Sequence, residues 1–521
     1  MKLLEKKHIP VLVVDFGSQT TQLILRRVRE LGVYCEVVSH KDIFNCIKES
    51  SPKAIIFSGG PASAFKKNAP KVNKKIYELN IPILGICYGM QVICEQHKGE
   101  VRETNIREFG KANIRVLKND PIFNKILKVD QKSQVWMSHG DKVNKIPKGF
   151  NVIANTDVIE VAAMSNNKKN IYGLQFHPEV VQSIKGKSIL RNFILKISKI
   201  KPSWKIENFL DKQVSIIKNL VGEDEVICGL SGGVDSSVVA ALINKAIGKK
   251  LTCIFVNNGL LRKDEEKEVL RDFKKYTKAK IVYINAKKDF LNSLKNIEDP
   301  EKKRKIIGKA FIKVFEREAK KIKNAKYLAQ GTLYPDVIES KSIEGAKLKI
   351  IKSHHNVGGL PKKLNLKLIE PLRELFKDEV RSLGASLLLP KNIINRHPFP
   401  GPGLAIRIPG AITEKKINIL KNADAIFIEE LKRNNLYEKI WQAFCVLLPI
   451  KSVGVMGDSR SYELTISIRA ITSKDGMTAE VFCFNEMFLK KISGRIVGEV
   501  KGVNRVLYDI TSKPPATIEW E

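Results

Sequence analysis

EVICGLSGGVDSSVVAALINKAIG, residues 225–248, begins with a short apolar run, passes through a glycine turn and ends in a helical pattern closed by Gly248. A similar succession of apolar run, polar or glycine turn and amphipathic stretch fills the first three quarters of the chain. Further apolar runs lie at residues 9–15, 54–57 and 83–86. This alternation is typical of parallel sheets flanked by helices. We therefore predict an α/β fold with its functional loops at the carboxyl ends of the strands.

Length and two breaks in the pattern predict three domains. The chain has 521 residues, and a domain usually takes about 100–200. Lys201-Pro202-Ser203 interrupts a helical stretch, and residues 397–403, HPFPGPG, cannot be helical because proline lacks the amide donor. We predict an α/β parallel-sheet domain over residues 1–199, a second over 200–396, and a smaller α+β domain over 397–521.

The high net positive charge raises the question of a nucleic-acid partner. The chain has 91 Lys+Arg against 55 Asp+Glu, a net charge of +36, which suits a nucleic-acid partner. The lysines are spread along the chain as pairs such as Lys66-Lys67 and Lys490-Lys491, so we favour a solvated surface and expect no nucleic-acid partner.

The chain also lacks the sequence marks of a membrane or secreted protein. No apolar run approaches the ~18–20 residues of a membrane-spanning helix, and the first residues lack the apolar region of a secretory signal. The eight cysteines form no C-x-x-C pair, which argues against a disulfide framework or a zinc ribbon. We expect a cytoplasmic protein with no membrane partner.

A cysteine lies on a predicted strand-to-helix turn, Gly85-Ile86-Cys87-Tyr88-Gly89. The flanking glycines suit a turn too crowded for a Cβ atom, and the helix behind the cysteine presents amides to a developing oxyanion. His177 and Glu179 follow another strand and would supply a base and the carboxylate that orients it. We predict a catalytic triad of Cys87, His177 and Glu179, with an oxyanion hole at Gly59 and Tyr88.

These motifs resemble those of the class I glutamine amidotransferases, over residues 9–197. The resemblance implies that the cysteine attacks the glutamine amide and that ammonia passes to a neighbouring synthase domain. Ser138-His139-Gly140-Asp141 is similar to the glutamine-pocket segment of that family, although a plain turn explains the same four residues equally well. A cysteine peptidase on the same fold is the competing interpretation, and a second catalytic domain downstream disfavours it.

The glycine turn after residue 229 can hold an anion, because successive amides and serine hydroxyls lie at the positive end of a helix. It lacks the lysine of Walker-type nucleotidases, and it resembles the PP-loop of N-type ATP pyrophosphatases, which adenylate an oxygen and expel pyrophosphate. The resemblance implies ATP binding at Ser231, Gly232, Gly233, Val234, Asp235, Ser236 and Ser237, with Asp235 as a ligand of the Mg²⁺ that accompanies ATP. Asn257 stands where that family has Asp, so we assign it no metal role.

Motifs along the whole chain resemble the GMP synthase family. They lie at residues 330–340, 351–356, 370–372, 376–381, 396–403 and 512–521. The resemblance implies that XMP, ATP and glutamine become GMP, AMP, pyrophosphate and glutamate. A lysine and Mg²⁺ would neutralise the charge on pyrophosphate, and the candidates for the synthase site are Asp336, Glu339, Lys352 and Lys377.

The same resemblance implies an XMP site that includes the last residues of the chain. The XMP phosphate needs cationic donors and the ring needs a carboxylate or another polar edge. By resemblance, Arg304, Lys513 and Glu519 fill these roles. Residues 397–521 resemble the dimerisation domain of the family, so we expect a homodimer whose small-molecule partners are glutamine, ATP and XMP.

Two other interpretations stay open at this point. One is a basic nucleic-acid-binding protein that keeps an inactive amidotransferase fold, which a salt-sensitive gel shift without turnover would favour. The other is amidation of a different adenylated acceptor, as in NAD synthesis. Replacing the acceptor in the same assay would decide between this interpretation and GMP synthesis.

Overall fold

The computed structural model describes residues 8–277, 279–322, 324–337, 366–456, 459–473, 476 and 478–521. The chain divides into two compact units, Met1–Lys205 and Ile206–Glu521. The division into three domains stays a prediction. No helix in the described ranges is both long enough and apolar enough to cross a membrane.

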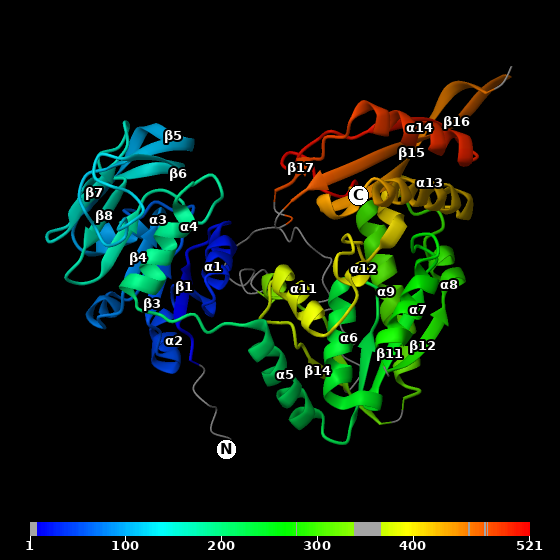
Figure 1. Ribbon diagram of the computed structural model, residues 1–521, viewed down its shortest axis with the longest axis horizontal. Coiled ribbons are helices and arrows are strands. Elements are labelled where there is room, and N and C mark those ends of the chain that lie inside the picture. Colours follow the sequence, from blue (N-terminus) through cyan, green and yellow to red (C-terminus); the bar gives the residue numbers. More distant parts are fainter. Residues whose placement is uncertain are drawn as a thin grey trace. The chain divides into compact units, whose positions relative to one another are not determined.

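The first unit is built around a nine-stranded sheet in the order β2-β1-β3-β4-β9-β8-β7-β5-β6 (Figure 1). Its first five strands run parallel, as the sequence predicts: β2 (Cys35–Ser39), β1 (Val11–Asp15), β3 (Ala54–Phe57), β4 (Ile83–Ile86) and β9 (Ile171–Leu174). The helices are α1 (Thr21–Glu30), α2 (Ile43–Ser50), α3 (Tyr88–Gln96) and α4 (Gly186–Arg191). Helix α3 packs against β4 and β9.

The other four strands of this sheet are antiparallel, and the sequence prediction did not include them. They are β5 (Glu100–Val116), β6 (Lys132–Lys145), β7 (Asn151–Asn155) and β8 (Ala163–Asn166). Along β6 buried side chains alternate with more exposed ones. A strand that faces water on one side has no continuous apolar run, so a search for such runs misses it.

The second unit contains a parallel sheet in the order β12-β11-β10-β13-β14. Its strands are β10 (Glu225–Gly229), β11 (Leu251–Asn257), β12 (Lys280–Asn285), β13 (Ala325–Ala329) and β14 (Lys367–Ile369). After β10 the chain adds β11 and β12 on one side of that strand, and it later adds β13 and β14 on the other side. Parallel α/β sheets bind ligands at such a switch point, beyond the carboxyl ends of the strands.

Helices cover this sheet. Helices α5 (Ile206–Val221), α6 (Val234–Ile247) and α11 (Lys377–Ser386) pack together, and α8 (Lys287–Ser293) packs on α9 (Pro300–Ala319). The remaining helices of this part are α7 (Glu265–Tyr276) and α12 (Lys391–Ile394). Helix α6 follows β10 directly and so begins at the switch point.

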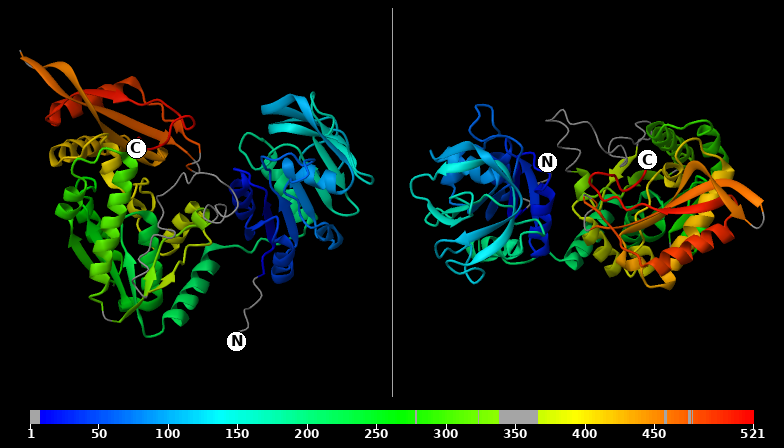
Figure 2. Two further views of the ribbon diagram at one scale, coloured as in Figure 1. Left: turned by 180° about the vertical axis from the view of Figure 1, so that it is seen from behind. Right: turned by 90° about the horizontal axis from the view of Figure 1, so that it is seen from above.

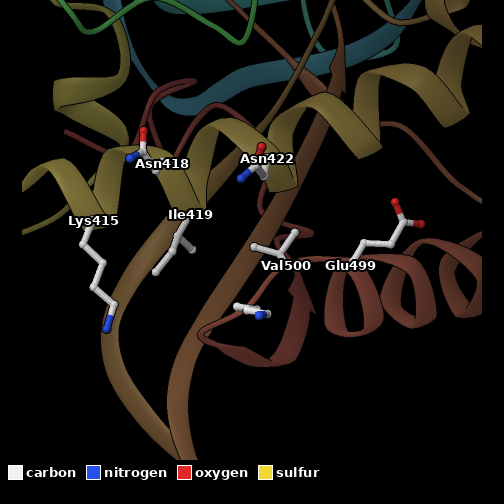
Figure 3. A pocket seen from close by; sticks show the side chains of 7 residues that line it. Lys415, Asn418, Ile419, Asn422, Glu499 and Val500 are labelled. Carbon is white, nitrogen blue, oxygen red and sulfur yellow. The ribbon is translucent and has the colours of Figure 1, made fainter.

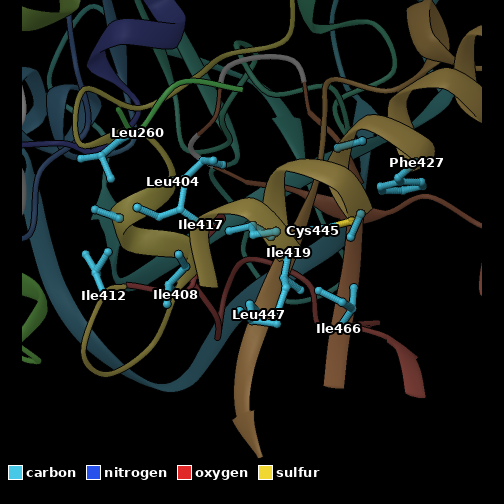
Figure 4. Close-up of a cluster of buried hydrophobic side chains, with 14 of the residues drawn as sticks. Leu260, Leu404, Ile408, Ile412, Ile417, Ile419, Phe427, Cys445, Leu447 and Ile466 are labelled. Atoms are coloured by element: carbon cyan, nitrogen blue, oxygen red, sulfur yellow. The ribbon is translucent and has the colours of Figure 1, made fainter. Parts of the chain in front are cut away.

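The end of the chain forms a smaller sheet within the second unit. A long antiparallel hairpin of β15 (Gln442–Met456) and β16 (Ser459–Thr472) is joined by β17 (Glu480–Val481) and β18 (Val503–Tyr508) (Figure 2). Helix α13 (Glu414–Arg433) packs on β15, and α14 (Glu486–Glu499) packs on β18. The buried cluster in Figure 4 joins Leu260, which follows β11, to side chains of α13, β15 and β16. One apolar core therefore extends from the parallel sheet into the smaller sheet.

Candidate functional site

Cys87 occupies a strained turn between β4 and α3. Its φ is 50° and its ψ is −106°, outside the conformations that residues with a side chain prefer. A Cβ atom on Gly85 would lie 2.6 Å from the backbone of Gly89, and one on Gly89 would lie 2.6 Å from Phe57. Only glycine fits at these two positions, which explains the motif around the cysteine.

His177 and Glu179 lie beside Cys87 because β4 and β9 are neighbouring parallel strands. The Cys87 amide donates to the Leu174 carbonyl at 2.7 Å, and three residues later His177 Nδ1 lies 2.7 Å from Glu179 Oε1. Both side chains are buried. Burial opposes protonation of the imidazole, but the Glu179 carboxylate and the hydrogen bond to Cys87 outweigh it and raise the pKa of His177 well above its ordinary value. A histidine with a raised pKa favours the imidazolium form, which suits a group that takes the thiol proton and passes it on in a later step.

Gly59 and Tyr88 lie at the same edge of the sheet. A Cβ atom on Gly59, just after β3, would come within 3.2 Å of the His177 ring. Tyr88 is the first residue of α3, and the first amides of a helix have no partner inside it. Three neighbouring strands, β3, β4 and β9, thus bring together the predicted oxyanion residues, the cysteine and the histidine.

Two further groups, neither of them predicted to touch the thiol, contact Cys87 Sγ. The Cys87 thiol donates to the Ser138 carbonyl at 3.5 Å, and Gln175 Nε2 donates to Cys87 Sγ at 3.7 Å. Ser138 belongs to the middle of β6, so the segment 138–141 is a strand and not a turn. The sequence signal was present in both cases, since each residue adjoins a motif, but the contacts depend on the pairing of distant strands.

A second buried histidine and carboxylate pair lies in this segment. His139 Nε2 is 3.2 Å from Glu108 Oε2, and Thr156 Oγ1 donates to Glu108 Oε1 at 3.3 Å. Both members of the pair are at least nine-tenths buried. This pair ties β6 to β5 next to the residue whose carbonyl contacts Cys87.

The PP-loop, residues 231–237, joins β10 to α6 at the switch point of the second sheet. Gly232 has a φ of 79°. The Ser231 amide donates to Ser236 Oγ at 3.2 Å, the Gly233 amide donates to Ser231 Oγ at 3.3 Å, and Ser237 Oγ donates to the Gly233 carbonyl at 2.8 Å. A tight loop of hydroxyls and amides therefore caps the positive end of α6, as an anion site requires.

Asp235 is where three segments of the second unit meet. Lys377, the first residue of α11, places Nζ 2.6 Å from both carboxylate oxygens of Asp235. A Cβ atom on Gly331, just after β13, would lie 3.3 Å from the Asp235 side chain. Asp336 Oδ2 accepts the Leu333 amide at 2.9 Å. The other two candidates for the synthase site, Glu339 and Lys352, lie outside the described residues.

Each residue predicted to bind XMP contacts another part of the protein in this structure. Arg304, on α9, donates to the Glu521 carbonyl. Glu519 accepts from Arg407 Nη2 at 2.9 Å and from Gln442 Nε2 at 2.6 Å, and Lys513 Nζ donates to the Gly476 carbonyl at 2.8 Å. Residues 513–521 are therefore tied to the smaller sheet and to α9.

Two of the hollows in the described part of the second unit differ in their relation to the predicted site residues. One of about 310 Å³ is lined by nine residues, including Arg381, His397, Trp441 and Ser473. Asn395 and His397 in this lining flank Arg396, whose Nη1 donates to the Gly232 carbonyl of the PP-loop at 2.7 Å. The other, of about 630 Å³, is lined by Lys415, Asn418, Ile419, Asn422, Glu499, Val500 and Lys501 (Figure 3). Within the described part of the chain, its lining includes none of the predicted site residues.

Three family models match the chain. The class-I glutamine amidotransferase model matches residues 12–197, the NAD synthase model residues 204–306, and the GMP synthase C-terminal domain model residues 429–520. The NAD synthase match is limited to the part that contains the PP-loop.

Curated relatives match almost the entire chain. The GMP synthase (glutamine-hydrolyzing) of Bartonella henselae is 54% identical over 511 residues, which cover 98% of this chain and 98% of the relative. The protein of the same name from Carboxydothermus hydrogenoformans is 56% identical over 511 residues, covering 98% and 99%. That of Brachyspira hyodysenteriae is 55% identical over the same length, with the same coverage.

Proposed function

Because the chain belongs to the family of glutamine-hydrolysing GMP synthases, we propose that its two units divide one reaction. The first unit releases ammonia from glutamine, and the second adenylates XMP with ATP and replaces the adenylate with that ammonia. One observation supports this assignment above all. Strands β4 and β9 are neighbours, and they bring Cys87, which has a strained backbone, next to the hydrogen-bonded pair of His177 and Glu179.

In the first unit, Cys87 is the nucleophile and His177 is the base. The Cys87 sulfur attacks the side-chain amide carbon of glutamine, His177 takes the thiol proton and returns it to the departing ammonia, and a thioester remains. Water then attacks the thioester carbon while His177 takes a proton from the water; the C–S bond breaks, His177 returns the proton to the Cys87 sulfur, and glutamate leaves. Glu179 holds the imidazole in orientation, while amides at Gly59 and Tyr88 stabilise the oxyanion of each step.

In the second unit, the PP-loop binds the phosphates of ATP. The 2-oxygen of XMP attacks the α-phosphorus, and the bond from that phosphorus to the pyrophosphate breaks. Ammonia then attacks the C2 carbon, and AMP leaves with the oxygen. Lys377 lies beside Asp235 and is placed to neutralise charge on the pyrophosphate.

Asp235 is the residue that would hold Mg²⁺. It offers one carboxylate at the start of α6, and Mg²⁺ is commonly held by one or two carboxylates together with substrate phosphates. In this structure both oxygens of that carboxylate contact Lys377 Nζ, so the oxygens face a position where a cation is bound. When bound, Mg²⁺ neutralises charge on the phosphates.

We place XMP in the 310 Å³ hollow next to the PP-loop. Arg381 and Trp441 supply a cation and an aromatic face there, groups that suit a phosphate and a purine ring. Arg304, Lys513 and Glu519 remain predictions as XMP ligands, and so does Asp336 in the synthase site. The homodimer and the cytoplasmic location also remain predictions.

This division of the reaction is tested by measuring GMP formation separately with glutamine and with free ammonia as the nitrogen source. We expect Cys87→Ala to abolish GMP formation with glutamine and to leave GMP formation with free ammonia within about twofold of the wild type, since only the first unit loses its nucleophile. Cys94→Ala, in the helix α3 that follows Cys87, is the matched control, because burial raises the pKa of Cys94 to about 12 and makes it a poor nucleophile. Equal loss of both activities in Cys87→Ala would contradict the division.

The acceptor is tested in the same assay. With ammonia, ATP and Mg²⁺ present, AMP release should depend on XMP. It should not occur when the carboxylic-acid precursor of NAD replaces XMP. Release with that precursor would instead favour amidation of a different acceptor.

A further inference from the structure

We propose that Arg396 and Glu265 form a positioning pair that fixes the orientation of one peptide group in the PP-loop. The peptide group joins Gly232 to Gly233. This proposal rests on the ATP-binding role proposed above for the loop. Arg396 precedes the HPFPGPG segment and Glu265 is the first residue of α7, so both lie far from the loop in sequence.

Arg396 connects the loop to Glu265 through two separate donors. Its Nη1 donates to the Gly232 carbonyl at 2.7 Å, and its Nη2 donates to Glu265 Oε1 at 2.7 Å. Glu265 is 3% exposed, and its second oxygen accepts the Arg262 amide at 2.7 Å. Each carboxylate oxygen thus has a donor, so the guanidinium is held firmly when it reaches the loop.

The contact with the carbonyl determines where the amide of the same peptide group points. A peptide group is planar, and in the usual trans form its C=O and N–H point in opposite directions. With the Gly232 carbonyl held by Arg396, the Gly233 N–H points toward Ser231 Oγ, 3.3 Å away. That hydroxyl lies 2.9 Å from Ser236 Oγ. The amide therefore faces the side of the loop on which serine hydroxyls gather.

This peptide group needs to be held because glycine flanks it on both sides. Gly232 has a φ of 79°, and a glycine exchanges easily between backbone conformations that other residues avoid. Rotation of the Gly232–Gly233 plane would turn a carbonyl, instead of an amide, toward the phosphates. A ligand that binds only one orientation has an apparent affinity reduced by the fraction of molecules in that orientation.

Helix α7 also restricts the space around Gly232. A Cβ atom on Gly232 would lie 2.6 Å from Val269 Cγ2 and 3.3 Å from Arg396 Nη1. Gly232 is therefore seated directly against α7 and the guanidinium. The loop, α7 and Arg396 form one packed arrangement, and the pair acts on ATP only through the loop.

The variants for the test keep the charge or the shape of the pair. Arg396→Lys retains the cation, but one ammonium cannot present the two forked donors of a guanidinium. Glu265→Gln retains the shape and removes the charge that holds Arg396. We expect each variant to raise the Kd of a non-hydrolysable ATP analogue with Mg²⁺ about tenfold. We expect the KM for XMP in the ammonia-dependent assay to stay within about twofold, which a general structural defect would not produce.

Two further variants make the result interpretable. Arg495→Lys is the matched control, since Arg495 binds Glu430 and Glu499 in the same unit through α14; it should lower thermal stability without changing the Kd of the ATP analogue. Ser231→Ala tests the loop itself and should raise that Kd. If Ser231→Ala raises the Kd while Arg396→Lys and Glu265→Gln leave it within about twofold, the positioning role is wrong and the ATP site stands. If Ser231→Ala also leaves it unchanged, the proposed role of the loop is wrong.

Discussion

His397 is held as a neutral imidazole by two hydrogen bonds of opposite direction. The Ala443 amide donates to Nδ1 at 3.2 Å, so Nε2 carries the proton and donates to the Tyr437 carbonyl at 2.8 Å. The ring also stacks on Tyr437, with 3.8 Å between centroids. The pKa of His397 is lowered to about 4, chiefly by burial; the Tyr437 carbonyl and Asp424 oppose this shift, and the charges of Arg262 and Arg381 add to it.

This residue should make the second unit sensitive to acid. Between the ordinary pKa of about 6.5 and the folded value of about 4, the unfolded chain binds a proton that the folded chain does not. The free energy of unfolding therefore falls as pH drops through this window, by about 3 kcal/mol at most from this group. Urea denaturation at pH 7, 5.5 and 4.5 measures the change. His397→Gln should have a shallower pH dependence than the wild type, and equal slopes would contradict the assignment.

For single residues, motifs predicted which side chains lie together in the first unit, but not the groups that surround them. Cys87, His177 and Glu179 could be predicted because each lies in a short motif at a strand end. The contacts of Ser138 and Gln175 with the thiol could not, since they require the pairing of strands far apart in the sequence. Arg396 was part of a recognised motif, yet its contact with Gly232 depends on how α7 packs behind the loop.

The end of β11 and the start of α7 form one hydrogen-bonded corner. Asn257 Nδ2 donates to Glu266 Oε2 and lies 3.2 Å from the Tyr283 hydroxyl. Asn257 Oδ1 accepts the Gly259 amide at 2.8 Å. The amide of Asn257 is thus the group that allows Glu266 to sit against this strand. A carboxylate at position 257 would keep the contact with Gly259 and lose the contact with Glu266.

Asn257→Asp should therefore weaken this corner. Two carboxylates in contact raise each other's pKa, and a group with a raised folded pKa loses its contribution to stability as pH rises through that value. We expect a loss of about 1–2 kcal/mol at pH 8, and a smaller loss at pH 5. Thermal unfolding at both pH values measures it. Adding Glu266→Gln to Asn257→Asp should restore the stability, and failure of the double variant to recover would contradict this explanation.

For helices and strands, prediction succeeds where a buried strand is also an unbroken run of apolar residues, and it fails for β8, which is buried but reads Ala-Met-Ser-Asn. The runs at residues 54–57 and 83–86 coincide with β3 and β4 because both are fully buried. Strands β5 and β6 escaped prediction because their charged residues alternate with apolar ones, so the sequence shows no apolar block. The order of the parallel strands also had to come from the structure, since the sequence does not show on which side of β10 the chain places β13.

For the assembly of the molecule, three exposed apolar side chains gather on one face of the smaller sheet, beside the exposed cations Lys451 and Arg460. Val453 and Tyr462 are cross-strand partners in the hairpin of β15 and β16, and Val455 lies on the same face because side chains alternate along a strand. Their exposed fractions are 54%, 59% and 76%. Together with the resemblance of this part to a dimerisation domain, the patch supports a second copy of the chain as its partner.

Val455→Lys tests this surface. A buried lysine opposite an apolar face should weaken association about 100-fold, or about 3 kcal/mol. Light scattering during size-exclusion chromatography should give the mass of two chains for the wild type and of one chain for the variant. Leu388→Lys is the control, since Leu388 is 83% exposed and lies after α11. A wild type of single-chain mass, or a Val455→Lys variant that keeps the double mass, would contradict the prediction.

Three fully buried cations find their partners in the segment 517–521, which supplies either a carboxylate or backbone carbonyls to each of them. Lys303 binds Glu521, Arg407 binds Glu519, and Arg469 binds the carbonyls of Thr517 and Ile518. A buried cation without its partner is strongly unfavourable. Replacing or deleting these five residues would remove these partners from Lys303, Arg407 and Arg469 and so disturb the interior of the enzyme. A labelling strategy should therefore leave this end of the chain unaltered.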